Sequence, residues 1–281
     1  MRLFKKVMIL IVIFVAGIFI TWETVNNNKV MLDIKPKDIY EVNAHNQVKL
    51  LSSKSAPNLI QRAEPVANTS SSVVLYCSSN KTLKQVALTF DDGPDVCYTP
   101  QILDILKQNN VKATFFIVGL NAQSHPEMIR RIVSEGHAIG NHTWDHPILS
   151  KLSAARVKEE VQKTEQLLYN ITGLKTAMFR PPYGEANPQL IDEISSLGYK
   201  IIDWSVDTRD WDKTPVSKIM DNVSNEIYPG GIILQHCSGG KSEHLSNTVK
   251  ALPQIISLLK SQGYNFVMVQ DLLDIPNSQH K

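Results

Sequence analysis

The alternation of apolar runs with amphipathic segments from residue 83 onward constrains the fold of this chain more than any other feature. Helical segments are repeatedly followed by a glycine and then by an apolar run, at Gly136, Gly173, Gly198 and Gly263. A glycine at this place can end a helix and let the chain turn into the next strand. Because strand–helix–strand units produce parallel pairing, the sequence predicts a mainly parallel sheet.

Apolar runs are the expected strands, and the segments between them are the expected helices. The strands are expected at residues 86–90, 113–118, 137–141, 177–180, 200–206, 231–236 and 266–269. The helices are expected at residues 98–108, 127–134, 188–197, 216–227 and 246–261, with a further long helix between Ser153 and Gly173. This series predicts an α/β fold in the form of a (β/α) barrel, closed or partly open, and a doubly wound open sheet is the alternative.

The N-terminus has the pattern of an export signal. Arg2, Lys5 and Lys6 form a basic cluster, and residues 7–22 are almost wholly apolar. This run is slightly shorter than the ~20 residues that span a bilayer, and no clear small-residue cleavage site follows it. We expect residues 1–22 to be an uncleaved single-pass anchor with the rest of the chain outside the cell membrane. A cleaved signal peptide and secretion are the alternative.

Residues 23–82 differ from the remainder of the chain because they are polar, nearly free of aromatic side chains and without a sustained period. This composition is typical of a stalk that carries a domain away from a membrane. Residues 73–77, at its end, can form a short strand that belongs to the domain. The expected organisation is therefore an anchor, a stalk, one domain over residues 83–275 and a tail over residues 276–281.

Bulk composition argues against several classes of function. The net charge of +2 predicts no strongly basic surface, so nucleic acid is not an expected partner. No glycine-rich phosphate-binding motif follows a strand, so nucleotide binding has no support. The cysteines Cys77, Cys97 and Cys237 are too few for a disulfide-dense scaffold and form no CxxC pair. We expect free or buried thiols, and a Cys77–Cys97 bridge is the alternative in an exported protein.

Polar residues follow the expected strands, at the place where parallel α/β proteins carry their functional groups. The first strand ends in Asp91 and Asp92, whose side chains point in different directions because side chains alternate along a strand. One carboxylate can bind a metal while the other carries a proton. A solvated Asp-Gly-Pro turn is the alternative.

The third expected strand is followed by His142 and His146. A spacing of four residues lets both imidazoles face one cation on a helical turn. With one aspartate they would form a site of two nitrogens and one oxygen that keeps open positions for water. This is the composition of a catalytic rather than a structural metal site.

Three further strand ends carry polar residues. Arg180 precedes Pro181 and Pro182, which stiffen the loop and fix where the arginine and the later N–H groups point. The fifth strand leads towards Asp210, and the sixth ends at His236. A histidine at a strand end, opposite a carboxylate from another loop, can act as a general acid.

From about residue 84 to about residue 273, the chain resembles the polysaccharide deacetylase family, also called the NodB-homology domain or carbohydrate esterase family 4. Five short motifs occur in the family's order, each at a strand end. They are Thr89-Phe90-Asp91-Asp92-Gly93, His142-Thr143-Trp144-Asp145-His146, Arg180-Pro181-Pro182-Tyr183, Asp207-Thr208-Arg209-Asp210-Trp211 and Leu234-Gln235-His236. The resemblance implies a distorted (β/α) barrel of the NodB-homology type and a catalytic domain that removes acetyl groups from a glycan.

The resemblance also implies a role for each motif residue. Asp91 would be the general base, held by Arg180, and His236 would be the general acid, oriented by Asp210. The backbone N–H of Tyr183 would contribute to the oxyanion site. The implied metal ligands are Asp92, His142 and His146, and the implied pocket residues are Trp211, Leu234 and Pro182. The metal would be divalent, with zinc expected first and cobalt, nickel or manganese as alternatives.

One position departs from the family's pattern. Many members have an aspartate after the histidine of the fifth motif, whereas this chain has Cys237. The difference concerns the neighbouring loop and the substrate subtype more than the catalytic groups. A thiol nucleophile is not expected here, because a single cysteine usually packs as a small hydrophobic side chain.

We expect the chain to deacetylate N-acetylglucosamine or N-acetylmuramic acid residues of peptidoglycan. The alternatives are the same chemistry on chitin oligomers, an exopolysaccharide, O-acetylated xylan or a small cyclic amide, and a wall-binding module without activity. The sequence favours an enzyme because every residue of the implied catalytic set is present. The expected partners are the cell-wall glycan and, through the N-terminal segment, the membrane.

Overall fold

The structure is a computed structural model that describes residues 40–42, 48–50, 73–239 and 245–275. The predicted anchor, most of the predicted stalk and the predicted tail lie outside the described residues. No helix of the described part is long and apolar enough to cross a membrane.

The chain divides into two compact units, Met1–Ala67 and Asn68–Lys281. In the first unit, strand β1 (Tyr40–Val42) pairs antiparallel with β2 (Val48–Leu50). The sequence predicted no strand before residue 73, and this expectation was wrong. Segments of three residues are too short to show a period of two.

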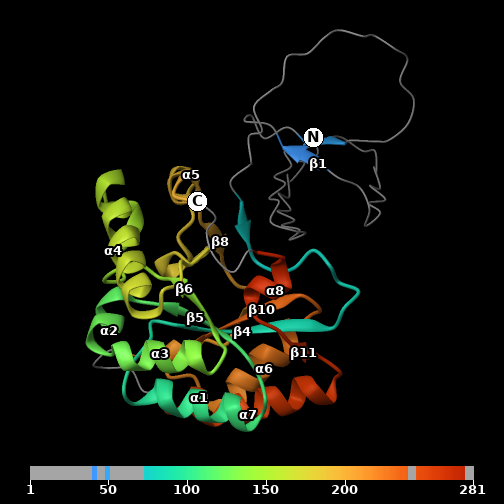
Figure 1. The fold of residues 1–281 in the computed structure, drawn as a ribbon. Helices are drawn as coiled ribbons and strands as arrows, with labels where there is room; N and C mark the ends of the chain where they lie inside the picture. Colours follow the sequence, from blue (N-terminus) through green and yellow to red (C-terminus); the bar gives the residue numbers. More distant parts are fainter. Residues whose placement is uncertain (1–39, 43–47, 51–72, 240–244, 276–281) are drawn as a thin grey trace, which may run out of the picture. The chain divides into compact units, whose positions relative to one another are not determined.

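In the second unit, a parallel sheet curls into an incomplete, distorted barrel (Figure 1). Its strands are hydrogen-bonded in the order β3-β8-β7-β6-β5-β4-β10-β9, with every neighbouring pair parallel. These strands are β3 (Val74–Leu75), β4 (Gln85–Asp91), β5 (Thr114–Ile117), β6 (Ala138–Asn141), β7 (Met178–Phe179), β8 (Lys200–Ile202), β9 (Val206–Asp207) and β10 (Gly231–His236). The short strand β11 (Asn265–Phe266) pairs with β4. The α/β class and the parallel sheet are thereby confirmed.

The sequence predicted one strand over residues 200–206, whereas the structure has two short strands, β8 and β9, in this region. The chain pairs with β7 and β3 at the start of this run and with β10 at its end. Between them, the N–H of Asp203 donates to the carbonyl of Leu75, and that of Ser205 donates to the carbonyl of Ile232. The strand therefore breaks into β8 and β9 because its partners change.

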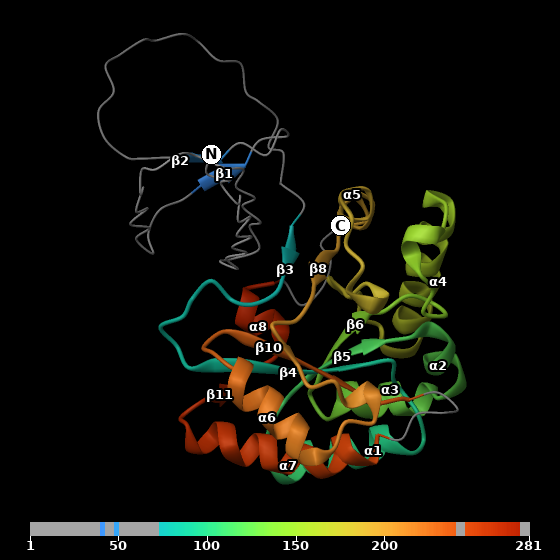
Figure 2. The same ribbon diagram turned by 180° about the vertical axis from the view of Figure 1, so that it is seen from behind.

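Helices flank the sheet, as Figures 1 and 2 show from opposite sides. On one face lie α1 (Tyr98–Gln108), α3 (Pro126–Ser134), α6 (Val216–Glu226) and α7 (Ser246–Ser261). The remaining helices are α2 (Gly119–Ser124), α4 (Ala154–Thr172), α5 (Pro188–Ser196) and α8 (Val269–Leu273). Gly173 ends α4 in the left-handed conformation, as predicted, whereas the Ser153 side chain makes no capping hydrogen bond.

Helices α2 and α8 were not predicted. Helix α2 has six residues and begins with a glycine, so it carries no readable period. The last strand was expected over residues 266–269, but β11 ends at Phe266 and α8 begins at Val269.

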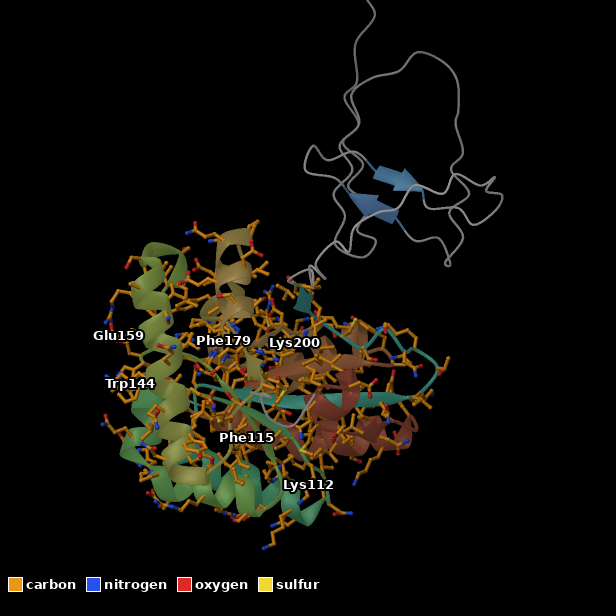
Figure 3. All side chains as sticks on the ribbon, turned by 45° about the horizontal axis from the view of Figure 1, so that its top comes forward. Lys112, Phe115, Trp144, Glu159, Phe179 and Lys200 are labelled. Atoms are coloured by element: carbon orange, nitrogen blue, oxygen red, sulfur yellow. The ribbon has the colours of Figure 1, made fainter. Side chains whose placement is uncertain are left out.

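The apolar core of the second unit consists of three clusters packed against the sheet. Phe115 of β5 is fully buried in the cluster between the sheet and α1, α3, α6 and α7, and Phe179 of β7 is fully buried against α4 and α5 (Figure 3). A third cluster fills the barrel interior, where Val269 and Leu272 of α8 pack beside Phe116. The barrel is thus filled at its core, and the functional groups lie at its carboxyl-terminal edge.

Candidate functional site

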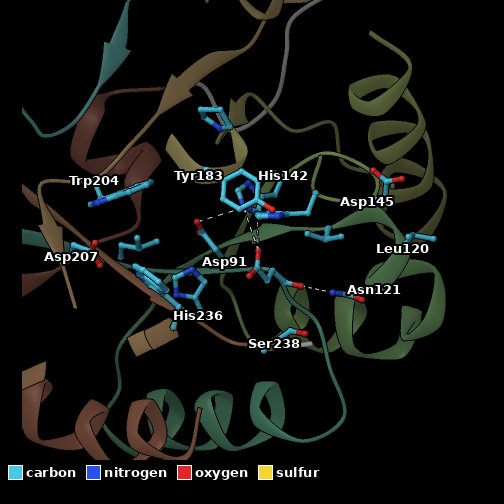
Figure 4. Close-up of a pocket in the computed structure, with 17 residues that line it drawn as sticks. Asp91, Leu120, Asn121, His142, Asp145, Tyr183, Trp204, Asp207, His236 and Ser238 are labelled. Atoms are coloured by element: carbon cyan, nitrogen blue, oxygen red, sulfur yellow. Dashed lines mark hydrogen bonds and ion pairs between the residues drawn. The ribbon is translucent and has the colours of Figure 1, made fainter. Parts of the chain in front are cut away.

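The carboxyl ends of the strands open into one cavity of about 720 Å³ (Figure 4). Asp91 ends β4 and His236 ends β10, and these two residues are paired in the ladder that joins the strands. The cavity is lined by Asp91, Asp92, Val118, Leu120, Asn121, His142, Asp145, His146, Pro181, Tyr183, Trp204, Asp207, Trp211, Leu234, His236, Ser238 and Gly239. The polar strand ends that the sequence singled out therefore do meet at one place.

Asp92, His142 and His146 have their ligand atoms within 4.8 Å of one another. The Asp92 Oδ1 atom lies 3.4 Å from Nε2 of His142 and 3.4 Å from Nε2 of His146. It is buried and has no hydrogen-bond partner. A tetrahedral zinc site with bonds of about 2.0–2.1 Å places its ligand atoms about 3.3 Å apart. The three side chains therefore fit a divalent metal, which would satisfy the oxygen that the protein leaves without a partner.

Protonation in this group also suits metal binding. The Nδ1 atom of His142 lies 2.6 Å from the carbonyl oxygen of Arg180, so Nδ1 donates its proton there and the lone pair of Nε2 faces Asp92. Burial lowers the pKa of His146, which favours the neutral imidazole that binds metals. Burial would raise the pKa of Asp92, but the imidazoles of His142, His236 and His146 around it outweigh burial and lower this pKa to about 2.

The loop that carries His142 and His146 is not the helical turn that their spacing predicted. Thr143 and His146 both have left-handed backbone angles, with φ values of 69° and 60°. The Asn141 side chain accepts from the N–H of Thr143, and the Thr143 hydroxyl accepts from the N–H of His146. These bonds fold the loop so that both imidazoles converge, with ring centroids 4.9 Å apart.

Asp91 is held by a fully buried arginine. Its Oδ1 atom accepts from Nη1 of Arg180 at 2.7 Å, and its Oδ2 atom lies 3.7 Å from Nε2 of His142. Arg180 also donates to the Thr89 hydroxyl and to the carbonyls of Ile202 and Asp203. The guanidinium is therefore satisfied on several sides, and one carboxylate oxygen of Asp91 remains directed at the proposed metal group.

His236 is paired with Asp210. The Nδ1 atom of His236 lies 2.8 Å from Oδ1 of Asp210, and the N–H of His236 donates to Oδ2. Burial alone would lower the pKa of His236, but the carboxylate of Asp210 outweighs this effect and raises the pKa to about 10. The imidazole therefore carries a second proton at neutral pH. Since Nδ1 is bound to Asp210, Nε2 is the nitrogen left for the cavity that His236 lines.

The predicted pocket residues are only partly in the expected places. Tyr183, Trp211 and Leu234 line the cavity, but Pro181 lines it in place of Pro182, which is buried at the start of the short 3-10 turn Pro182–Gly184. Tyr183 has a φ of 61°, which turns its ring outward to 64% exposure and against His146. The donor role of its backbone N–H remains a prediction.

Sequence reasoning missed several residues of the site. Trp204 lies in the break between β8 and β9, and Leu120 and Asn121 come from the unpredicted helix α2. The Asn121 amide donates to the carbonyl of Asp92 at 2.6 Å and so supports the left-handed backbone of Asp92. Position alone could have identified Leu120 and Asn121, because they directly follow a predicted strand.

The cysteines are free in the structure, and the Cys77–Cys97 bridge is not formed. Cys237 is fully buried and its N–H donates to the carbonyl of Asp91. A Cβ atom at Gly93 would collide with its sulfur, so the glycine makes room for it. Burial raises the pKa of the Cys237 thiol well above its ordinary value. The side chain therefore packs as an inert part of the core behind the catalytic strand end.

Comparison with known proteins identifies related chains. Residues 78–202 match the profile of a family described as polysaccharide deacetylase. A peptidoglycan-N-acetylglucosamine deacetylase of Bacillus cereus is 45% identical over 188 residues, which are 67% of this chain and 68% of that protein. PgdA of Listeria monocytogenes, also named a peptidoglycan-N-acetylglucosamine deacetylase, is 41% identical over 192 residues. These are 68% of this chain but only 39% of PgdA.

Solved structures give the same likeness. A peptidoglycan N-acetylglucosamine deacetylase bound to a naphthalenyl N-oxidanyl-benzamide matches with a TM-score of 0.70 and 40% identity, covering 73% of this chain and 94% of that chain. A pseudoenzyme of carbohydrate esterase family 4 from Bacillus anthracis matches with a TM-score of 0.67 and 32% identity, covering 73% of this chain and 70% of that one. The fold alone therefore does not decide whether a chain is active, and the site has to be considered residue by residue.

Proposed function

The chain belongs to the polysaccharide deacetylase family, carbohydrate esterase family 4, whose chemistry is hydrolysis of an amide bond, and we propose that it removes the N-acetyl group from N-acetylglucosamine residues of peptidoglycan. N-Acetylmuramic acid residues of the same polymer are the second choice of substrate. The choice of peptidoglycan as the substrate is supported by the relatives in Bacillus cereus and Listeria monocytogenes, which are both named peptidoglycan-N-acetylglucosamine deacetylases.

One observation carries this proposal. Asp92 lines the same cavity as Asp91 and His236, and its buried Oδ1 atom has no hydrogen-bond partner. Behind the cavity wall, Arg180 pairs with Asp91 and Asp210 pairs with His236. An inert relative would be expected to lack part of this set, whereas here each group has its supporting partner. The completeness of the set therefore favours an active enzyme over a wall-binding module.

Asp92, His142 and His146 would hold the divalent metal. We propose zinc because the set of two nitrogens and one oxygen is common in catalytic zinc sites, and cobalt, nickel or manganese are the alternatives. When bound there, the metal would supply Lewis-acid polarisation of the acetyl carbonyl and of the attacking water.

Asp91 is placed to act as the general base. Arg180 occupies Oδ1, so Oδ2 is the oxygen that faces the three proposed ligands and can accept the proton of the water. The buried arginine fixes the orientation of the carboxylate, because its other hydrogen bonds tie it to Thr89 of β4 and to the carbonyl of Asp203 after β8.

His236 is placed to act as the general acid. The Nδ1–H group of the imidazolium donates a hydrogen bond to Asp210, which leaves the Nε2 proton for the leaving amine. An amine is a poor leaving group until it is protonated, so the raised pKa of His236 serves this step. The backbone N–H of Tyr183 would stabilise the negative charge that develops on the acetyl oxygen.

The cavity walls suit a sugar. Trp204, Trp211 and Tyr183 present aromatic surface around the polar floor, and Leu234 adds an apolar contact for the acetyl methyl group. Pockets of this kind fix a ligand by a few polar groups within an otherwise apolar lining. Trp211 is 46% exposed in the absence of a substrate, so a polymer can reach it from solvent.

We also propose that the enzyme works outside the cell membrane, carried by the anchor predicted for residues 1–22 and the stalk predicted for residues 23–82. The basic cluster and apolar run at the N-terminus support this location, as does a substrate that lies in the cell wall. Fractionation of cells into membrane, wall and medium, with an antibody against the catalytic domain, tests it. Recovery in the medium would indicate a cleaved signal peptide instead.

The activity is tested by measuring acetate release from purified peptidoglycan and from N-acetylglucosamine oligomers. The full-length chain, kept in mild detergent, is assayed as isolated, after chelation, after zinc is restored, and as Asp91→Asn beside the exposed control Asp212→Asn. We expect acetate that disappears on chelation, returns with zinc and is lost only in Asp91→Asn. Acetate from the oligomers but not from peptidoglycan would point to a different glycan as the substrate. A folded, metal-loaded protein that releases no acetate from any glycan would sink the proposal.

A further inference from the structure

The backbone of the loop between His142 and His146 is held from two sides. On one side, the first N–H groups of α2, from Gly119 and Leu120, donate to the carbonyls of Thr143 and Trp144 at 2.9 and 2.8 Å. These bonds satisfy the carbonyls of the loop but leave its N–H groups to find partners elsewhere. The left-handed angles in this loop would not persist without such partners.

On the other side lies Glu160 of α4, a buried carboxylate with 2% exposure. Its Oε2 atom accepts from the N–H of Trp144 at 2.9 Å and from the N–H of Asp145 at 3.2 Å. Its Oε1 atom lies 3.3 Å from Nη2 of Arg156, one turn earlier on the same helix. A single carboxylate oxygen therefore accepts hydrogen bonds from two successive N–H groups of the loop that carries both histidines.

We propose that Glu160 is a positioning residue that holds the loop in its metal-binding conformation before the metal arrives. This inference rests on the metal site proposed above for Asp92, His142 and His146. The hydrogen bonds of the Glu160 carboxylate to this loop go to backbone N–H groups between the two histidines, so it acts through the backbone rather than on the ligand side chains.

A carboxylate suits this task better than any neutral side chain. Two successive N–H groups that point the same way form a concave site of partial positive charge, and an ionised oxygen binds such a site more strongly than an amide oxygen. Both residues are buried, since Glu160 is 2% and Trp144 is 8% exposed, and the Trp144 ring packs between Lys163 and Gly119. The hydrogen bonds of Glu160 to the loop are therefore shielded from water. In such a buried place, the loss of a hydrogen-bond acceptor costs more free energy than it would at the surface.

The same helix offers a matched control. Glu159 is the next residue along α4, is 54% exposed and pairs with Nη1 of the same Arg156 at 2.5 Å. Figure 3 shows Glu159 on α4, at the outer side of the molecule near Trp144. Glu159→Gln and Glu160→Gln remove the same charge from the same helix, but only Glu160→Gln changes the acceptor for the loop.

The first experiment measures the zinc dissociation constant of the full-length wild type, Glu159→Gln and Glu160→Gln by competition with a chromogenic chelator. Loss of a supporting partner of a metal ligand weakens metal binding roughly 10–100-fold, and we expect this change in Glu160→Gln only. The melting temperature of each metal-free protein is recorded beside it. A lower melting temperature of Glu160→Gln with the same zinc affinity as Glu159→Gln would make Glu160 merely structural and overturn the inference.

The second experiment needs no variant and covers the case in which Glu160→Gln does not fold. Hydrogen exchange of the Trp144 and Asp145 amides is measured in the metal-free wild type. We expect both to be protected at least ~100-fold over a free peptide, because Glu160 already occupies them. Exchange at the rate of a free peptide, with protection only after zinc is added, would show that the metal orders the loop and would overturn the inference. Absence of zinc binding in the wild type would instead remove the metal site itself.

Discussion

The proton on His236 depends on Asp210, so Asp210→Asn is the sharpest test of the proposed acid. Asp210 is 2% exposed, and its oxygens accept from the N–H and Nδ1 of His236 and from the Thr248 hydroxyl. Burial would lower the pKa of His236, yet the carboxylate raises it from 6.5 to about 10. This rise corresponds to roughly 5 kcal/mol in favour of the imidazolium.

Asp210→Asn removes the largest of the effects that raise the pKa of His236 and leaves the smaller ones of Asp92 and Asp91 against burial, so this pKa should fall to about its ordinary value of 6.5. The wild type keeps the proton throughout the range from about pH 6 to about pH 8.5, whereas the protonated fraction of the variant falls roughly 80-fold across it. The kcat/KM of the variant, relative to the wild type, should fall by about the same factor. The imidazolium also stabilises the folded wild type, fully below pH 6.5 and progressively less as the pH rises through about 10.

The assay is acetate release from an N-acetylglucosamine oligomer across this pH range with saturating zinc. Asp212→Asn is the control, because Asp212 is an exposed carboxylate in the same 3-10 turn, Asp210–Asp212. Labelling of the histidine nitrogens and NMR would report the charge of His236 directly. A ratio of variant to wild-type kcat/KM that stays constant from about pH 6 to about pH 8.5 would refute the assignment of Asp210 as the group that holds the proton.

Three further predictions concern stability and reactivity. Burial raises the pKa of Asp203 from 3.8 to about 6 despite the nearby arginine, so its charge destabilises the fold as the pH rises through this window. Asp203→Asn should therefore increase the free energy of unfolding, and the increase should be roughly 2 kcal/mol larger at about pH 8 than at about pH 4. Denaturant titrations at both pH values measure it, and an equal increase at the two would contradict this prediction. Gly119→Ala should cost about 1–3 kcal/mol in the same titrations because its Cβ would collide with Trp144; an unchanged midpoint would mean that the ring can move aside. A thiol reagent should label the exposed Cys97 in the native protein but reach the buried Cys237 only after unfolding, and native labelling of a Cys97→Ser variant at Cys237 would show otherwise.

The grouping of Asp91, His142, Arg180 and His236 could be predicted from the sequence. Each follows an apolar run, and the carboxyl ends of parallel strands share one edge of a sheet. The helix–glycine–strand pattern also predicted the parallel pairing. This pattern depends on the spacing of apolar residues and on where helices end, and neither requires knowledge of a particular contact. Features that repeat along the chain are visible without the structure.

Features that depend on one hydrogen bond between distant residues could not be predicted. The helical period places Glu160, three residues after Val157 and four before Thr164, on the buried face of α4, but only the folded chain shows that it binds two loop N–H groups. The conformation of the His142–His146 loop is of the same kind. Its spacing is compatible with a helical turn, and the choice of left-handed angles is made by contacts with α2 and α4.

The pairing of Asp91 with His236 in the ladder between β4 and β10 has a consequence for how the enzyme fails. These strands lie within the sheet rather than at its ends and are almost wholly buried, so their amides should open only when the whole domain unfolds. Asp92 and His146 instead depend on loops with left-handed backbone angles. Gentle heating should therefore release the metal first, while the acid and the base stay in register, and cooling with fresh metal should return the activity without refolding.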